Sequence, residues 1–458
     1  MKTTKRKMLF HSFYDHTGIE AHLERMAEQG WLLDKIGKAF WHYRRIEPRK
    51  LAFAVSYFPR ASAFDPGPSE EQETFYDFCA HTGWTLAASS AQMQVFYNDR
   101  PSPVPIDTDP ALEVDAIHQS AKKGYLISMF VFLGLAIMEE AMFAVQLLTR
   151  PLDMLCNSYA IFATVCYLAL FLLTVVELTS YYTWRRRAKR AAEQGEFLPT
   201  RSHPVFQKAL LALIAAGFVW LAASQASGGD GPLAVSMVVL TCSIFVIIAV
   251  VSGVSALMKR KNVSRDTNLM VTYTLTIVLS LAVVSIVVLS TISLMDSGPG
   301  QAIRPNEFPL TLPELLGVPL DDGDWDRDLD VTQSPLMGYW SAQQYLWNKQ
   351  EESGPAWLSY SIVVVKAPFL YGVCKDEMLS RYDTRDRTGV PEGQKMWYEP
   401  ADPAPWGAEE AYWRYHQNPE AGNREYLLCY PGRIVEITFD WEPTPEQIAL
   451  AAEKLGGQ

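Results

Sequence analysis

The sequence predicts an α+β membrane protein, with a folded domain on each side of a helical membrane region. Several stretches of about twenty residues between positions 125 and 295 carry almost no charge, the length that crosses a ~30 Å hydrocarbon core. A phrase built around Gly-Trp occurs twice within residues 1–100. Most of the 13 tryptophans lie in residues 308–458. At 458 residues the chain is long enough for separate domains.

The repeated phrase predicts a duplicated unit in residues 1–100. It reads "AEQGWLLDKIGKAFWHY" at 27–43 and "AHTGWTLAASSAQMQVFY" at 80–97. Each copy follows a strand and a helix, so the unit is strand-helix-strand-strand. The strands are predicted at "MLFHSFY", "WLLDKI", "AFWHYRRI", "LAFAVSYF", "WTLAAS" and "MQVFYN". We expect one antiparallel sheet with both helices on one of its faces.

Local signals place the ends of the two helices. Thr17 with Glu20, and Ser69 with Gln72, fit the capping box, in which each side chain satisfies a free backbone N–H. Gly30 and Gly83 follow the helices, where a left-handed residue commonly ends a helix.

Aromatic residues on the predicted strands have two interpretations. They could line a pocket for an apolar ligand, because binding pockets are largely apolar and aromatic. They could equally be core residues, since aromatics favour strands. The residues concerned are Trp41, Tyr43, Tyr57, Phe96 and Tyr97. The histidines of this region match no metal-ligand spacing, and no metal or cofactor is expected.

The segment "FYDHTGIEAHLERMAEQGWLLDKIGKAFWHYRRIEPRKLAFAVSYFP" resembles the family called domain of unknown function 2812. The resemblance rests on the helix "IEAHLERMAEQGW" and the strands "FWHYRRIEP" and "AFAVSYFP". It implies a bacterial membrane protein, often encoded beside PadR-type transcriptional regulators. The family has no established activity, so the resemblance implies an architecture and a location but no catalytic residues.

Five membrane spans are predicted, and their flanking charges predict the orientation. Basic groups gather at "AKKG", "WRRRAKR" and "MKRKNVSR", whereas "SQASGGDGP" has none. Because positive charge favours the cytoplasmic side, we expect a cytoplasmic N-terminus and an extracytoplasmic C-terminal region in the cell membrane. The spans are Tyr125–Leu148, Ser158–Trp184, Phe206–Ser224, Leu233–Met258 and Leu269–Met295, between linkers at 101–124 and 296–307.

Glu139 and Glu140 lie about two-thirds of the way along the first span. A carboxylate at that depth is costly and marks a polar path or a protonation site. Alternatively, the span ends near Met138 and "EEAMFAVQLL" lies along the outer interface. Glu177 is expected to pair with the basic residues that follow the second span.

Residues 308–458 are predicted to form an extracytoplasmic α+β domain. Strands are predicted at "WLSYSIVVVKA", "LYGVCK" and the hairpin "EYLLCYPGRIVEITFD", followed by a helix with Thr444 at its start. The tryptophans fit either a platform for sugar or peptide, or a core. Cys374 and Cys429, both on predicted strands, could form a disulfide in that compartment. "DDGDWDRDLD" resembles a cation loop, but Arg327 and Gln333 occupy positions that need Gly and Glu.

The sequence predicts a non-enzymatic, sensory or regulatory membrane protein. No HExxH or GxSxG motif occurs, and no nucleophile, base and orienting group can be assembled from spacing. The net charge of −11 arises in the last part of the chain and does not favour nucleic acid as a partner. The expected partners are the lipid bilayer, a cytoplasmic regulatory protein, and a small-molecule or envelope ligand. The alternative is a transporter or export accessory with Glu139 or Glu140 as a proton site.

Overall fold

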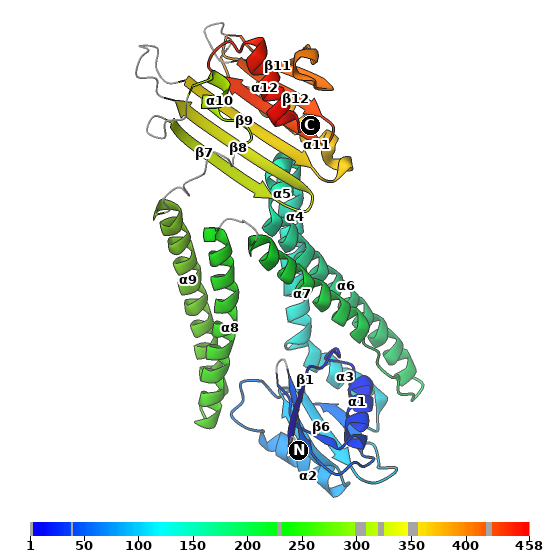
Figure 1. Ribbon diagram of the computed structural model, residues 1–458. Coiled ribbons are helices and arrows are strands. Elements are labelled where there is room, and N and C mark those ends of the chain that lie inside the picture. Colours follow the sequence, from blue (N-terminus) through cyan, green and yellow to red (C-terminus); the bar gives the residue numbers. More distant parts are fainter. Residues whose placement is uncertain are drawn as a thin grey trace. The chain divides into compact units, whose positions relative to one another are not determined.

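The computed structural model describes residues 3–37, 40–226, 231–297, 308–318, 325–346, 356–391, 393–417 and 424–457 (Figure 1). The chain forms two compact units. The first contains Met1–Glu139, Val165–Trp220 and Asp230–Ser293, and the second contains Glu140–Thr164, Leu221–Gly229 and Leu294–Gln458. The first unit therefore holds the N-terminal domain with most of the helical region, and the second holds the C-terminal domain.

The N-terminal domain is built from two copies of one unit. The first copy contains β1 (Thr4–Lys7), α1 (His16–Glu28), β2 (Trp31–Lys35) and β3 (Trp41–Arg45). The second contains β4 (Ala52–Tyr57), α2 (Glu70–His81), β5 (Thr85–Ser90) and β6 (Met93–Asn98). The strand orders, β1-β3-β2 and β4-β6-β5, are equivalent. The predicted duplication is thus visible in the topology.

Fine details repeat as well. The register shifts between Leu33 and Lys35 in β2, and at the equivalent place between Leu86 and Ala88 in β5. Gly30 and Gly83 follow the helices with φ of 79° and 92°, the left-handed region that a residue with a side chain rarely adopts. Both bulged strands are edges of their sheets, where a bulge twists the edge away from further pairing.

The expected single sheet with both helices on one face is wrong. The strands form two separate three-stranded antiparallel sheets. Phe53 and Val55 of β4 pack with α1 in the main core, whereas Ala52 and Ala54 pack with Phe96 in a smaller core beside α2. Because alternate residues of a strand point to opposite faces, the two helices cover opposite faces of the β4-β6-β5 sheet.

Three local predictions of the N-terminal domain are corrected. "MLFHSFY" is not a strand, since β1 lies just upstream at Thr4–Lys7. The cap of α1 is Asp15, which accepts from Gly18 N, and Thr17 lies within the helix. The stretch 101–124 contains a helix, α3 (Pro110–Lys122), that packs on the main core through Val114 and Ile117. Tyr14 packs on the membrane helices and Thr17 bonds to Thr200, and these long-range contacts override the strand and cap patterns of the local sequence.

The membrane region consists of long helices. They are α4 (Tyr125–Thr149), α6 (Ser158–Ala192), α7 (Pro204–Ala226), α8 (Gly231–Arg260) and α9 (Arg265–Ser297). Among the described residues, four are long and apolar enough to cross a membrane: Tyr125–Thr149, Ser158–Ala192, Pro204–Leu221 and Arg265–Ile286. These four fit a multi-pass membrane protein. The other predicted span falls on α8, part of which lies outside the residues whose side chains are described.

The second unit is organised around a seven-stranded antiparallel sheet, in the order β10-β11-β12-β13-β9-β8-β7. Its elements, in chain order, are α5 (Pro151–Cys156), α10 (Leu312–Leu316), β7 (Trp325–Gln333), β8 (Met337–Leu346), β9 (Ala356–Val365), η2 (Pro368–Leu370), α11 (Tyr371–Arg381), β10 (Met396–Ala401), η3 (Ala404–Trp406), β11 (Glu410–His416), β12 (Arg424–Tyr430), β13 (Arg433–Phe439) and α12 (Pro445–Gly456). The predicted hairpin is β12-β13, and Thr444 caps α12.

Figure 1 shows this sheet as a ribbon, and each of its faces has its own core. On one face, Val435 and Ile437 pack with Leu312 of α10 and Leu455 of α12. On the other, Val363 and Ile434 pack with Leu155 of α5 and Met378 of α11. The predicted strand "LYGVCK" is therefore wrong, because this segment begins α11 and covers the sheet instead of extending it.

Candidate functional site

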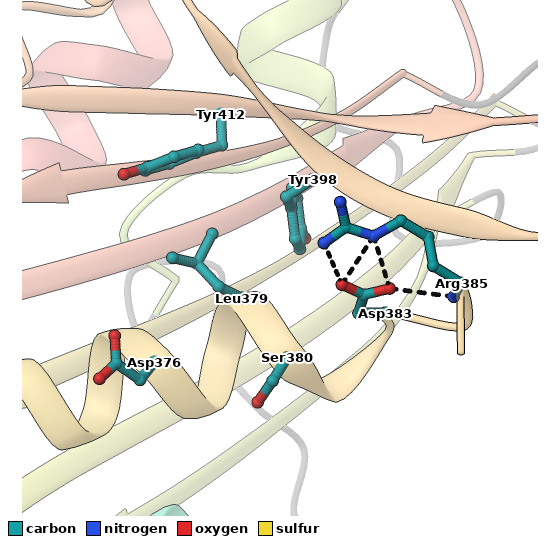
Figure 2. Close-up of a pocket in the computed structure, with 7 residues that line it drawn as sticks. All are labelled: Asp376, Leu379, Ser380, Asp383, Arg385, Tyr398 and Tyr412. Atoms are coloured by element: carbon teal, nitrogen blue, oxygen red, sulfur yellow. Dashed lines mark hydrogen bonds and ion pairs between the residues drawn. The ribbon is translucent and has the colours of Figure 1, made fainter. Parts of the chain in front are cut away.

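A polar pocket lies in the second unit between α11 and strands β10 and β11 (Figure 2). Its volume is about 260 Å³. The lining residues are Asp376, Leu379, Ser380, Asp383, Arg385, Tyr398 and Tyr412. Asp376, Leu379 and Ser380 come from α11, and Asp383 and Arg385 follow the end of that helix. Two carboxylates, one cation and two phenols thus meet at one concave surface.

The turn after α11 is held by an ion pair between near neighbours. Asp383 Oδ1 accepts from the backbone N of Arg385 at 3.0 Å and from Arg385 Nε at 3.1 Å (Figure 2). Arg385 Nη2 lies 2.5 Å from Asp383 Oδ2. These hydrogen bonds lower the pKa of Asp383, so the carboxylate stays ionised. The guanidinium also lies over the ring of Trp397, 5.7 Å from its centroid.

The two tyrosines have their hydroxyl groups engaged outside the pocket. Tyr412 donates to Glu410 Oε2 at 2.5 Å, and Lys375 Nζ lies 3.1 Å from Glu410 Oε1. These contacts raise the pKa of Tyr412 to about 12 and lower that of Glu410. Tyr398 donates to Glu436 Oε1 at 2.6 Å. The pocket therefore presents aromatic rings instead of free phenol donors.

Behind Tyr398, the sheet buries a charged cluster. Arg414 is 8% exposed and forms ion pairs with Glu425 and with Glu436, whose Oε1 is 2.5 Å from Nη2. Arg414 Nη2 also donates to the Tyr398 hydroxyl at 2.8 Å, and the guanidinium lies 3.9 Å from the centroid of Tyr382. Because buried charge needs a partner, this cluster fixes the position of Tyr398 at the pocket wall.

The arrangement fits binding better than catalysis. The pocket carboxylates, Asp376 and Asp383, outnumber the single cation, and the rings of Tyr398 and Tyr412 lie nearby. Aromatic faces and carboxylates together favour a small polar ligand that carries a positive charge. None of the residues that line the pocket is a histidine or cysteine. Within the described residues, no group of His, Cys, Asp and Glu side chains is placed to hold a metal ion.

In the first unit, the N-terminus of α1 is bonded to the segment that connects α6 and α7. Thr17 Oγ1 donates to Thr200 O at 3.0 Å, and Thr200 N donates to Thr17 Oγ1 at 2.9 Å. Asp15 Oδ2 accepts from Ser202 Oγ at 2.5 Å and lies 2.7 Å from His11 Nδ1. Burial raises the pKa of Asp15, but these hydrogen bonds outweigh it, so the net shift is downward. The cap of α1 thus doubles as a tertiary contact.

Aromatic residues extend this contact onto the membrane helices. Tyr14 is fully buried and packs against Tyr125 of α4 and against Tyr181 and Trp184 of α6. This explains why the segment around Tyr14 is not a strand, since its side chains face the helices instead of alternating across a sheet. The N-terminal domain is therefore packed directly on α4 and α6.

Glu177 of α6 lies at the same junction. Its Oε2 accepts from Tyr125 OH at 2.7 Å, and its Oε1 accepts from Gln207 Nε2 of α7 at 2.6 Å. The expected pairing with the basic residues after this span is wrong, because two neutral donors satisfy the buried carboxylate. Three membrane helices are joined through this one side chain.

The loop after β4 reaches α9. Asn268, which is fully buried, donates from Nδ2 to Phe64 O at 3.1 Å. Phe64 also packs against Tyr273, with ring centroids 6.3 Å apart, and Arg265 Nε lies 3.8 Å from Asp65 Oδ1. The N-terminal domain therefore contacts α4, α6 and α9, and the connection to α7.

A buried titratable cluster joins α1, α3 and β4. His16 Nε2 lies 3.0 Å from Glu113 Oε1, and Glu20 Oε1 accepts from Val55 N at 2.8 Å. Burial raises the pKa of Glu20 to about 7 and raises that of Asp107. Burial lowers the pKa of His16, but the hydrogen bond to Glu113 outweighs it and the net shift is upward. This cluster can therefore change its protonation near neutral pH.

The aromatic residues predicted to bind a ligand do not share one surface. Trp41, Tyr43 and Tyr57 are buried in the main core, and Tyr97 packs against it. Phe96 is fully buried in the smaller core beside α2, on the other face of its strand. The structure places all five within the packing of the domain, and ligand binding by them stays a prediction.

The two glutamates of the first span lie on α4, which runs past both without a break. The alternative in which the span ends near Met138 and "EEAMFAVQLL" lies along the outer interface stays a prediction, as does an intramembrane site at these two residues. Glu140 Oε1 is buried and has no hydrogen-bond partner among the described residues. Such an orphaned oxygen is unusual and marks a place where a proton or a polar partner would be accommodated.

The predicted disulfide is absent, because Cys374 and Cys429 are free. Cys374 lies on α11, not on a strand, and its Sγ is 3.5 Å from Met337 Sδ. Both thiols are buried in the core under α11, and burial raises the pKa of each to about 11. They are packing residues in this structure.

The acidic stretch 321–330 does not form a cation loop over its described part, since β7 begins at Trp325. Residues 321–324 lie outside the described residues.

The tryptophans of the C-terminal domain, predicted as either a platform or a core, differ in burial. Trp325 and Trp406 are buried core residues, whereas Trp413 is 38% exposed. Trp347 also lies outside the described residues.

Sequence reasoning missed the charged cluster and the contact of α1 with the α6–α7 connection. A signal for the first exists, because Glu425 and Glu436 lie on strands beside the buried apolar residues Leu427 and Ile434 of the same face. A charge in such a row predicts a buried partner on the next strand. No local signal could pair Thr17 with Thr200, which is 183 positions away.

Residues 15–131 match the family model described as Protein of unknown function (DUF2812). The match covers the N-terminal domain, α3 and the beginning of α4, so the resemblance predicted from the sequence is confirmed over these residues. No curated protein and no solved structure matches the chain.

Proposed function

We propose that this chain, which carries a DUF2812 region over residues 15–131, is a non-enzymatic membrane protein with a sensory or regulatory role. Its N-terminal domain is cytoplasmic by the distribution of basic residues and responds to the state of the membrane helices. Its C-terminal domain is extracytoplasmic and receives the signal.

The observation that carries the proposal is the bonding of α1 to the α6–α7 connection. Thr17 and Thr200 exchange hydrogen bonds in both directions, and Asp15 bonds Ser202. On this proposal the partly buried contact forms and breaks as the helices move, and in that way passes a small helix movement to the domain.

The helix α6 provides a route between the units. Its first residue, Ser158, donates to Gln333 O of the C-terminal domain at 2.7 Å. Its last turns carry Tyr181 and Trp184, which pack on Tyr14 of the N-terminal domain. Ser158 makes its contact within the second unit and Tyr181 and Trp184 make theirs within the first, so α6 has residues in both units.

The experiment compares wild type, a deletion strain, and a Thr17→Val/Thr200→Val double variant. Transcripts of the neighbouring genes and of the envelope-stress response are measured, with Thr149→Val as the matched control because Thr149 bonds Val145 O of its own helix. We expect the deletion and the double variant to change these transcripts, and the control to behave as wild type. Unchanged transcripts in the deletion strain would remove the basis of the proposal.

A second candidate function is transport or export, favoured by the orphaned Glu140 Oε1 on α4. On this hypothesis Glu139 or Glu140 takes up and releases a proton during solute movement. A Glu139→Gln/Glu140→Gln variant that is folded and inserted should then lose uptake or efflux of a solute. Normal flux in that variant would exclude this function.

A further inference from the structure

The second unit exposes two large apolar side chains on one short segment. Phe369 of η2 is 79% exposed and Val373 of α11 is 48% exposed. Single exposed apolar residues are common on proteins, but these two are only four positions apart, one on η2 and the other at the start of α11. Pro368 and Gly372, between and beside them, are exposed as well.

This segment is adjacent to the end of a candidate membrane helix. Leu370 of η2 packs on the same cluster as Leu147 of α4 and as Leu152 and Leu155 of α5. The next residue of α4, Leu148, is 85% exposed. Leu148 of α4 and Phe369 of η2 are thus exposed apolar residues that each follow or precede, along the chain, a residue packed on this cluster.

The level of α5 relative to the bilayer follows from the chain. α4 ends at Thr149 and α6 begins at Ser158, and both are candidate spans. Since α5 fills the short connection between them, it must lie at the surface of the membrane. The hydrogen bond from Ser334 Oγ to Leu155 O brings the sheet to the same level.

We propose that Phe369 and Val373 insert into the interfacial layer of the lipid bilayer beside the end of α4. The partner is the boundary between lipid headgroups and acyl chains, where apolar side chains leave water while neighbouring polar groups stay hydrated. The exposed side chain of Arg150, at the start of α5, supplies a cation that can reach a lipid phosphate from this level. The insertion would hold the C-terminal domain against the membrane.

The test uses the full chain in phosphatidylcholine nanodiscs, with a nitroxide spin label at Phe369→Cys or Val373→Cys. Collision of the label with oxygen, which partitions into lipid, is compared with collision with a water-soluble nickel chelate. The matched control is Glu446→Cys at the start of α12. This position follows the Phe439 end of β13, whereas η2 follows the strand end that pairs with Arg433, at the other end of β13. Wild type labelled in the same way gives the background from the six native cysteines.

We expect labels at both positions to favour oxygen over nickel severalfold, and the label at Glu446 to show the reverse. Nickel accessibility at Phe369 and Val373 equal to that at Glu446 would overturn the proposal. Low accessibility to both probes, with dipolar broadening between labels, would also overturn it, because the surface would then contact a second copy of the chain. Both results are independent of whether the protein regulates transcription.

Discussion

At the scale of single residues, burial changes the chemistry of Glu20. Its carboxyl group lies among His16, Glu113 and Glu24, and burial is the main reason its pKa rises to about 7. A carboxyl whose pKa is higher in the folded state binds a proton on folding between the two pKa values. Stability from this group is therefore greatest at low pH and is lost as the pH rises from about 4.5 to about 7.

His16 acts in the same direction. Its pKa is raised in the folded state by Glu113, so its stabilising contribution is present at low pH and is lost as the pH rises through the folded value. The titrations of Glu20 and His16 thus act in the same direction, and the junction of α1, α3 and β4 should lose stability as the pH rises toward and through neutrality.

The first prediction concerns the Glu20→Gln variant. It should flatten the fall in stability between about pH 4.5 and about pH 7, because glutamine cannot ionise. The difference should not exceed about 3 kcal/mol, since one pH unit of pKa difference corresponds to ~1.36 kcal/mol. The measurement is the melting temperature of the full chain in nanodiscs across this range. Glu28→Gln, at an exposed position of the same helix, is the control and should keep the wild-type slope.

The second prediction concerns Arg414. Replacing it with Met leaves Glu425 and Glu436 buried without their cation, which should cost roughly 3–5 kcal/mol. Lys375→Met removes an ion pair with Glu410, which is half exposed, and should cost at most about 1 kcal/mol. Denaturant unfolding of the C-terminal domain measures both variants. Equal losses would mean that the Arg414 cluster is not desolvated.

At the scale of elements, helix caps show which local signals hold in the folded chain. Ser69 and Gln72 form the predicted capping box of α2, and Thr444 with Gln447 forms one at α12. Thr17 does not cap α1, because its hydroxyl is taken by Thr200 and the neighbouring Asp15 caps the helix instead. A cap signal therefore holds where no tertiary partner competes for the side chain.

The third prediction follows from this difference. Ser69→Ala should destabilise α2 by about 1 kcal/mol, the usual cost of losing a cap. Amide hydrogen exchange of the first turn of α2 should rise in this variant and stay unchanged in α1. Thr74→Ala, on the same helix, is the control because its hydroxyl bonds Glu70 O within the helix. An effect spread over both helices would argue against a local role of the cap.

The element that the sequence predicts wrongly in the C-terminal domain is α11. "LYGVCK" has the alternation of a strand, but Cys374 and Met378 are one helical turn apart and both face the core. A short apolar run fits both periods, and only the neighbouring surfaces decide between them. Here the sheet face opposite α12 carries apolar side chains, and α11 and α5 bury them.

At the scale of the whole molecule, the predicted orientation rests on the distribution of basic residues and is open to a direct test. The fourth prediction is that a reporter fused after Ser297 acts outside the cytoplasm. Alkaline phosphatase should be active there and a cytoplasmic fluorescent protein dark, whereas a fusion after residue 100 should give the opposite pair. Cytoplasmic activity after Ser297 would overturn the five-span topology and the placement of the C-terminal domain.

The sequence by itself determined the elements whose signal is local or periodic. The duplicated unit was readable because Gly30 and Gly83 each end a helix in a conformation that favours glycine. The candidate spans could be predicted because a stretch of about twenty apolar residues is stable as a helix only inside a bilayer or a large core. Strands β9, β12 and β13 were readable from their runs of β-branched and apolar residues.

Only the tertiary structure decided what lies far apart in the chain. It divided the expected sheet into two, whose edge strands β2 and β5 are both bulged and neighbour each other without forming a ladder. It paired Thr17 with Thr200, Glu177 with Tyr125 and Arg414 with Glu436. A hydrogen bond or ion pair depends on distance in space, and a side chain carries no local mark of the partner that folding brings to it.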